Sequence, residues 1–183
     1  MKDPEISIGK CKGAYYPREE SWMMADVVKE HAFGKVLDMG CGTGIIGITA
    51  AMKGCDVTFS DIVPESVECA RINAKTNNVT GKFVVSDMFN NITDKFNTII
   101  FNPPYLPSHW YQVKHIALDG GKDGREYIER FIKEYKEHVL PEHKMLLLES
   151  SFNHWEDDLK RLNAKLMAKK HYFFEDVVVL MFE

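Results

Sequence analysis

The sequence predicts an α/β fold in which a mostly parallel β-sheet carries helices on both faces. Short apolar runs with strand character alternate along the chain with segments of helical periodicity, and this alternation is typical of parallel sheets with helical crossovers. A glycine-rich loop follows the first apolar run, and acidic or amide residues follow the next ones. With 183 residues, of which 45% are hydrophobic, the chain is expected to form one domain over residues 1–183.

The expected elements follow one another from residue 17 to the C-terminus. Gly54 ends one helical segment and Pro64 lies near the start of the next. Residues 124–139 give the clearest helix, because apolar side chains recur there on one stripe. Residues 171–183 are rich in β-branched and aromatic side chains and are expected to be strand. The expected helices are 17–31, 44–54, 64–78 and 124–139, and the other expected strands are 35–40, 56–61, 82–87, 96–102 and 144–150.

Charge and hydropathy exclude several classes of protein. The formal net charge of −4 argues against a broad nucleic-acid-binding surface. The basic stretch at 160–171 is interpreted as a solvated face, and a contact for an acidic partner is the alternative. No apolar run approaches the ~20 residues of a membrane helix, and the N-terminal MKDPEISIGKCKG lacks the apolar region of a secretion signal. We therefore expect a cytoplasmic protein without a membrane segment.

The cysteines and histidines give no metal-binding pattern. Cys11, Cys41, Cys55 and Cys69 contain no C-x-x-C pair, and the histidines lack close ligand spacing. No metal site is therefore predicted, and in a cytoplasmic protein the cysteines are expected to be free thiols.

The glycine-rich loop predicts a nucleotide-type ligand. Gly42-x-Gly44-x-x-Gly47 lies between a strand and a helix, and Asp61 ends the next strand. This arrangement is typical of Rossmann-like folds, in which such an acid binds the ribose and the ligand lies at the carboxyl ends of the strands. A side chain at Gly40 or Gly42 would occupy the volume of a ligand lying on the loop.

The charges around this loop favour a cationic ligand over a dinucleotide. Asp38 precedes the loop, Asp61 and Asp87 end the next two strands, and no lysine or arginine lies between residues 36 and 52. Carboxylates would repel a pyrophosphate in a desolvated cleft. S-adenosylmethionine also contains adenosine, but a sulfonium and an ammonium replace the phosphates, so the same acids would attract it.

Each acid can then be given a role. We assign Asp38 to the charged methionine end, directly or through water, and Asp61 to the ribose hydroxyls. Asp87 would accept from the adenine amino group, with Met88 against the ring. The alternative is that the glycines serve tight packing and the aspartates serve as caps.

The stretch TIIFNPPYLP ends the fourth strand in a stiff corner. Pro103 restricts Asn102 to extended conformations, and Pro104 restricts Pro103 in the same way. The Asn102 side-chain oxygen and the Pro103 carbonyl are thus fixed acceptors for the two hydrogens of a planar –NH₂ group. The Tyr105 ring would lie over that group. The alternative is a plain Pro-Pro turn after a buried strand.

In this order, the motifs LDMGCGTG, SDI, SDMF and FNPPY resemble those of the seven-strand amino-methyltransferases. The Asn-Pro-Pro-Tyr form occurs in enzymes that methylate adenine N6 and in those that methylate a glutamine amide. YYPREES (15–21) and LDGGKDGREYIERF (118–131) are similar to segments of the small archaeal and eukaryotic HemK-like glutamine methyltransferases. Those enzymes act on the Gly-Gly-Gln motif of class I peptide-chain release factors. The resemblance covers residue 14 to the C-terminus.

The resemblance implies a Rossmann-like seven-strand methyltransferase sheet with an antiparallel C-terminal strand, and an N-terminal segment and helix, 1–31, lining the cofactor site. Ser21 replaces a threonine of the family and Glu20 an aspartate. Eukaryotic members also work with a small zinc-binding activator. The expected catalytic residues are Asn102, Pro103 and Tyr105; the cofactor contacts are Ser21, Asp38, Gly40, Gly42, Asp61, Asp87, Met88 and Asn102; and the substrate contacts are Asn102, Pro103, Pro104 and Tyr105.

The leading hypothesis is a protein-glutamine N5-methyltransferase that uses S-adenosylmethionine and acts on a release factor. An N6-adenine methyltransferase on RNA or DNA is the second, but it must also flip a base and hold phosphates. Only the basic stretch at 160–170 offers it cations. A NAD-dependent or non-catalytic nucleotide-binding domain is the third, and calorimetry with both ligands would distinguish it.

Overall fold

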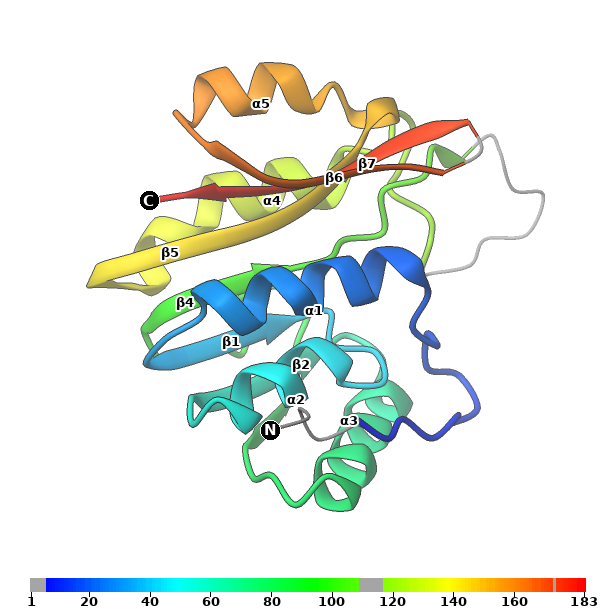
Figure 1. Ribbon diagram of the computed structural model, residues 1–183, viewed down its shortest axis with the longest axis vertical. Coiled ribbons are helices and arrows are strands. Elements are labelled where there is room, and N and C mark those ends of the chain that lie inside the picture. Colours follow the sequence, from blue (N-terminus) through cyan, green and yellow to red (C-terminus); the bar gives the residue numbers. More distant parts are fainter. Residues whose placement is uncertain (1–5, 109–116, 173) are drawn as a thin grey trace.

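The computed structural model describes residues 6–108, 117–172 and 174–183, which form a seven-stranded sheet flanked by helices (Figure 1). The strand order is β3-β2-β1-β4-β5-β7-β6. The strands are β1 (Lys35–Met39), β2 (Asp56–Asp61), β3 (Lys82–Val85), β4 (Phe96–Phe101), β5 (Val139–Ser150), β6 (Lys165–Tyr172) and β7 (Glu175–Phe182). The helices are α1 (Glu19–His31), α2 (Ile45–Met52), α3 (Pro64–Thr76), α4 (Glu126–Glu134) and α5 (Trp155–Arg161), with 3₁₀ turns η2 (Tyr135–His138) and η3 (Ser151–Asn153).

The sheet is mostly parallel with an antiparallel C-terminal strand, as predicted. β1 pairs in parallel with both β2 and β4, and β2–β3 and β4–β5 are also parallel pairs. β7 runs antiparallel to β5, and β6 antiparallel to β7. The chain moves outward from β1 to β3 and then returns to place β4 on the other side of β1. The order therefore reverses between β1 and β4, where ligands of open α/β sheets bind.

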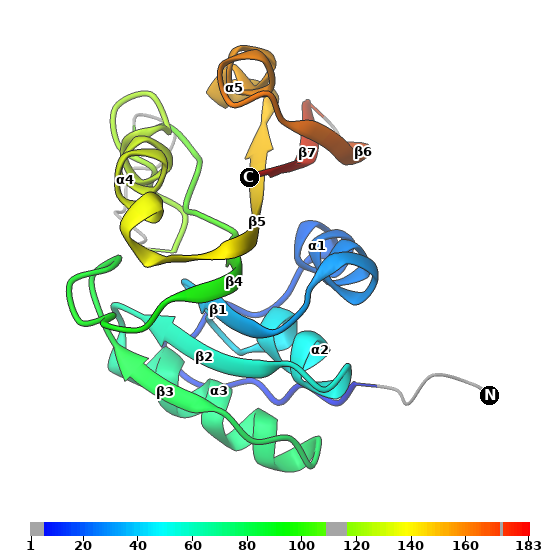
Figure 2. The same ribbon diagram turned by 90° about the vertical axis from the view of Figure 1, so that its left-hand side faces the viewer.

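Helices cover both faces of the sheet (Figure 2). α1, α2 and α3 lie on one face, and α4 and α5 lie on the other. Alternate residues of the central strands serve the two layers, so Ile100 packs with the α1–α3 side and Ile99 with Phe131 of α4. Within the described ranges, no helix is long and apolar enough to cross a membrane.

The structure departs from the prediction near the C-terminus. The strand expected over 171–183 is divided, because β6 ends at Tyr172 and β7 begins at Glu175. α5 is not predicted, since its seven residues are too few to show a helical period. The basic stretch at 160–171 spans the end of α5 and the edge strand β6. Its lysines are exposed, which agrees with a solvated face.

The prediction of free thiols is wrong for two of the four cysteines. Cys11 and Cys69 form a disulfide, whereas Cys41 and Cys55 are free. The pair is separated by 58 residues and meets only because the chain before α1 runs along α3. Neither the residue type nor the sequence spacing predicts this disulfide.

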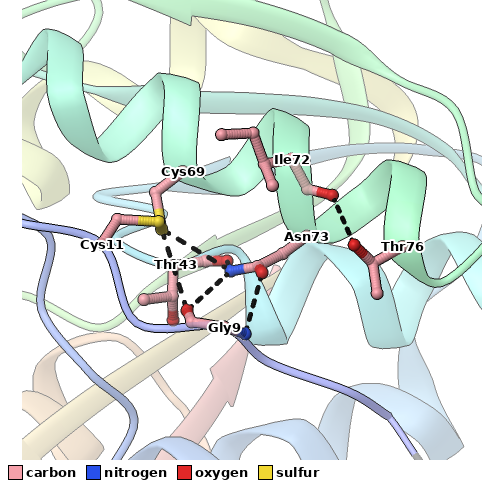
Figure 3. Close-up of a disulfide and its surroundings, with 7 residues drawn as sticks. All are labelled: Gly9, Cys11, Thr43, Cys69, Ile72, Asn73 and Thr76. Atoms are coloured by element: carbon pink, nitrogen blue, oxygen red, sulfur yellow. Dashed lines mark hydrogen bonds between the residues drawn. A yellow bond between two sulfur atoms is a disulfide. The ribbon is translucent and has the colours of Figure 1, made fainter.

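The disulfide fastens an N-terminal strap, defined here as residues 6–15, to α3 (Figure 3). Asn73 accepts from the Gly9 N–H at 2.9 Å and donates to the carbonyl oxygens of Gly9 and Thr43. One turn on, Asn77 makes a matching pair of bonds with the backbone of Ser7. The strap therefore leads the chain in a fixed course from α3 to the glycine loop and then to α1.

Candidate active site

One pocket opens at the carboxyl ends of β1, β2 and β4. It brings together residues from the strap, the start of α1, the glycine loop, the loops after β2 and β3, and the segment after β4. Of the residues predicted for the site, all except Asp38 line this pocket: Ser21, Gly40, Gly42, Asp61, Asp87, Met88, Asn102, Pro103, Pro104 and Tyr105. The structure thus brings these residues together in one pocket, although they come from positions far apart in the chain.

The glycine loop takes a conformation that side chains disfavour. Gly40 has φ +66° and Gly42 has φ +53°, which is the left-handed region that costs other residues free energy. A Cβ on Gly42 would also lie 3.3 Å from the Tyr15 carbonyl oxygen of the strap. The need for glycine at position 42 thus comes from the backbone conformation and from the strap.

Asp38 lies behind the loop rather than in the pocket wall. It is 1% exposed, and its Oδ2 accepts from the Gly47 N–H in the first turn of α2 at 2.8 Å. Burial raises the pKa of this carboxyl to about 7, with the Gly47 bond opposing the rise and the Asp61 charge adding to it. A Cβ on Gly47 would lie 2.8 Å from Asp38 Oδ2. Asp38 therefore holds the loop to α2, and a direct contact with the ligand finds no support here.

Asp61 is the acid that both fixes the loop and faces the pocket. Its Oδ2 accepts from the Gly42 N–H and its Oδ1 from the Val63 N–H, each at 2.9 Å. Burial outweighs these bonds and raises the pKa of Asp61. A carboxylate has about four lone-pair directions, so each oxygen can still accept from one hydroxyl of a vicinal diol. This geometry suits a ribose.

Asp87 and Met88 form the far wall after β3. Asp87 Oδ1 lies 3.0 Å from Arg130 Nη1 of α4, an ion pair that the sequence analysis missed. The separation of 43 positions gives no signal for it, because α4 meets this loop only in the folded sheet. Met88 adopts φ +49°, and its carbonyl accepts from Ser86 Oγ at 2.9 Å. The loop thus presents an apolar side chain beside a carboxylate whose Oδ2 makes none of the hydrogen bonds found among the described residues.

A further acid, Glu20, lines the pocket from α1. It is 8% exposed, and its Oε1 accepts from Tyr15 OH at 2.7 Å and from Ser21 Oγ at 3.0 Å. Glu20 and Tyr15 belong to the motif YYPREES, but the sequence analysis does not assign them to the site. The motif could have indicated them, because it also contains the predicted cofactor contact Ser21.

The Asn-Pro-Pro-Tyr corner (Asn102–Tyr105) completes the pocket. Asn102 is partly exposed, Pro103 is buried, and none of the hydrogen bonds among the described residues uses the Asn102 side chain. The Tyr105 carbonyl accepts from Asn153 Nδ2 at 2.8 Å. The corner therefore offers an amide oxygen to a ligand while its own backbone is held from behind.

The chemistry of this lining fits S-adenosylmethionine and does not fit a dinucleotide. The described lining residues include Glu20, Asp61 and Asp87 but contain no lysine, arginine or histidine. A partly buried acidic lining attracts a sulfonium and an ammonium and repels phosphates.

Comparisons with known proteins also indicate a methyltransferase that uses S-adenosylmethionine. Residues 19–173 match the family described as "Methyltransferase small domain". A protein of Methanocaldococcus jannaschii, provisionally named a protein N5-glutamine methyltransferase, is 36% identical over 91% of this chain and 89% of its own length. The release factor glutamine methyltransferase of Deinococcus radiodurans is 32% identical over 73% of this chain and 53% of its own length.

A solved structure shows the same fold at lower identity. The 16S rRNA N2 G1207 methyltransferase of T. thermophilus, in complex with AdoMet and guanosine, gives a TM-score of 0.66 at 17% identity. The alignment covers 94% of this chain and 45% of that one. The chain therefore belongs to the methyltransferase small domain family, together with the HemK-like proteins above, and is a class I methyltransferase whose cofactor is S-adenosylmethionine.

Proposed function

We propose that this protein transfers a methyl group to the side-chain amide nitrogen, N5, of a glutamine in a protein. The observation that carries the proposal is the Asn-Pro-Pro-Tyr corner, whose Asn102 amide lines the acidic cofactor pocket and is not used by the described structure. Two relatives that are at least 30% identical carry names of glutamine methyltransferases. The acceptor we propose is the Gly-Gly-Gln glutamine of a class I release factor.

The corner solves the central difficulty of this reaction. An amide nitrogen is a poor nucleophile, because its lone pair is delocalised into the carbonyl. Asn102 Oδ1 and the Pro103 carbonyl can accept its two hydrogens and stabilise the charge that develops on nitrogen. The cofactor supplies an electrophilic methyl group; the new N–C bond forms as the S–C bond breaks.

No general base is needed for this step. The nitrogen loses a proton to water after methyl transfer, when the bond to carbon has already formed. The corner contributes alignment, and a well-aligned acceptor can lower the barrier by about 7 kcal/mol or more. Tyr105 lies at the end of the corner, where its ring can cover the planar amide. The site residues thus act by orientation and hydrogen bonding.

The partners follow from the same proposal. A release factor is the protein substrate we propose, and a small zinc-binding activator, implied by the sequence resemblance alone, stays a prediction. A cytoplasmic location is likewise proposed from the substrate. N6-adenine methylation would use the same corner and stays the alternative.

The test is transfer of labelled methyl from S-adenosylmethionine to a purified class I release factor. The matched control is the same factor with its Gly-Gly-Gln glutamine changed to alanine. We expect label on the first protein and none on the second. Label that persists on the control, or that appears only on RNA or DNA, would overturn the proposal.

A further inference from the structure

A buried asparagine behind the Asn-Pro-Pro-Tyr corner ties three segments together. Asn153 of η3 is 0% exposed. Its Nδ2 donates to the carbonyl oxygens of Tyr105 at 2.8 Å and of Gly124 at 3.1 Å. Its Oδ1 accepts from the Ser150 N–H at 2.9 Å. One side chain therefore fixes the corner to the end of β5 and to the turn before α4.

The turn before α4 is shaped for this contact. Gly124 has φ +77°, and a Cβ there would lie 2.2 Å from the Tyr105 carbonyl oxygen and 2.7 Å from Asn153 Nδ2. Gly120 also lies against the corner backbone, since a Cβ on Gly120 would lie 2.7 Å from the Pro104 carbonyl oxygen. Both glycines let the turn lie directly against the corner backbone.

Arg125 holds the asparagine in turn. Its side chain is 14% exposed, and its guanidinium donates to the Asn153 carbonyl oxygen through Nη1 and to Asp158 Oδ2 through Nη2 at 2.7 Å. Asp158 is 1% exposed and also pairs with Arg161 at 2.6 Å. The planar guanidinium can make these bonds together because its donors point in fixed directions.

We propose that Asn153 and Arg125 are positioning residues that hold the corner in register with the cofactor for methyl transfer. Neither lines the pocket, so they act through the backbone of Tyr105. The inference rests on the proposed function, because it assigns the corner to the reacting group. A displacement of the acceptors by about 1 Å costs on the order of a hundredfold in rate, so turnover is more sensitive to this brace than cofactor binding is.

The decisive variant is Asn153→Asp, which keeps the acceptor for Ser150 and removes both donors. Asn97→Asp is the matched control, because Asn97 also bridges two backbone groups, Lys35 N–H at 3.0 Å and Glu142 O at 2.9 Å, but at the amino end of β4, away from the corner. We expect Asn153→Asp to lower kcat on the order of tenfold to a hundredfold, with KM for S-adenosylmethionine unchanged. The control should lose thermal stability without losing kcat. Equal kcat in the two variants would overturn the inference.

Arg125 gives an independent arm. Arg125→Lys keeps the charge but cannot bond Asn153 and Asp158 in the same plane, so it should recover only part of the kcat that Arg125→Met loses. Arg71→Met controls for loss of an arginine, because Arg71 on the exposed surface of α3 pairs with Glu68 and lies over the Phe83 ring, away from the corner. If Arg125→Met keeps the wild-type kcat, the inference is wrong.

Hydrogen exchange separates this inference from the proposed function. In Asn153→Asp, but not in Asn97→Asp, the amide of Leu106 and its neighbours should exchange faster, whatever the acceptor of the methyl group is. Absence of label on the release factor would contradict the proposed function alone. Unchanged exchange at the corner would contradict the brace alone.

Discussion

The N-terminal strap, next to the glycine loop, is held by a disulfide and neutral amide bonds, whereas the Asn-Pro-Pro-Tyr corner on the proposed acceptor side of the pocket is held through buried charges. On the cofactor side, the Cys11–Cys69 disulfide, Asn73 of α3 and Asn77 at the C-cap of α3 fix the strap. On the acceptor side, Arg125 and Asp158 hold Asn153 behind the corner. Cross-links respond to reductant and buried charges respond to pH, so the strap and the corner are expected to fail under different conditions. The glycine loop beside the strap also carries the buried carboxyl of Asp38, whose pKa is raised to about 7, so this contrast concerns the strap alone.

Glu149 makes the acceptor side sensitive to pH. It is 0% exposed, and no donor among the described residues bonds its carboxyl oxygens. Burial, followed by the negative charge of Asp158, raises its pKa to about 9. Glu149 is therefore neutral at pH 7 and can donate to Asp158, while Arg125 lies 3.7 Å away. The charged side chains of this cluster are then the positive Arg125 and Arg161 and the negative Asp158 and Glu129, which form ion pairs with one another.

The largest effect is expected at the acceptor. Asn102→Ala removes one of the two acceptors for the –NH₂ group and should lower kcat on the order of a hundredfold to a thousandfold, with a modest loss of cofactor affinity. Single-turnover kinetics and calorimetry measure the two quantities. Asn91→Ala, on the exposed side of the loop after β3, serves as the control. Near wild-type turnover in Asn102→Ala would show that the corner does not bind the reacting group.

Asp61→Ala should reduce cofactor affinity more than turnover. Hydrogen bonds to a charged group are worth about 1.5–3 kcal/mol each, so losing the ribose contacts should weaken cofactor binding by at least tenfold. Turnover at saturating cofactor should fall less. Asp56→Ala at the exposed start of β2 is the control for loss of a charge. Calorimetry that finds equal affinities in the two variants would remove Asp61 from the cofactor site.

The third effect is on stability as a function of pH. The pKa of Glu149 in the folded protein is raised above its usual value of 4.5. The free energy of unfolding that Glu149 contributes is therefore largest below pH 4.5 and is lost as the pH rises toward about 9. The loss is about 1.4 kcal/mol per pH unit. Glu149→Gln keeps a donor without a titrating proton, so its melting temperature should depend less on pH between 5 and 9. Glu142→Gln, which is exposed, should behave as wild type; identical pH profiles in all three proteins would refute the buried neutral Glu149.

The smallest effect is expected from the strap. Reduction of the disulfide leaves the asparagine bonds of the strap in place, so S-adenosylmethionine affinity should fall only severalfold, because the cross-link adds to existing restraints. kcat at saturating cofactor should not change. Cys11→Ser should reproduce the effect and make the protein insensitive to reductant, whereas Cys55→Ser should not. A loss of kcat on reduction would show that the two sides are not independent.

The parts of this site that the sequence predicted are those carried by local backbone chemistry. The glycine loop, the acid after β2 and the Asn-Pro-Pro-Tyr corner each combine a special conformation with a strand end, so each is visible in a few consecutive residues. The strands and helices from α1 to α4 were predicted for the same reason, since their periodicity is local.

The parts that the sequence did not predict depend on contacts between distant segments. The Arg130–Asp87 pair, the Cys11–Cys69 disulfide and the contact of Asn153 with Tyr105 join elements that meet only in the folded sheet. Asp38 is a mixed case, because its position at a strand end predicts a ligand contact, directly or through water. In the structure its Oδ2 accepts from the first turn of α2, and the ligand contact stays a prediction.

The most direct test of the account is a crystal structure with S-adenosylhomocysteine and a peptide containing Gly-Gly-Gln. We predict that the glutamine amide nitrogen lies between Asn102 Oδ1 and the Pro103 carbonyl oxygen, within hydrogen-bond distance of both, and faces the cofactor sulfur. A complex in which the glutamine lies away from this corner, or in which the sulfur points elsewhere, would contradict the account.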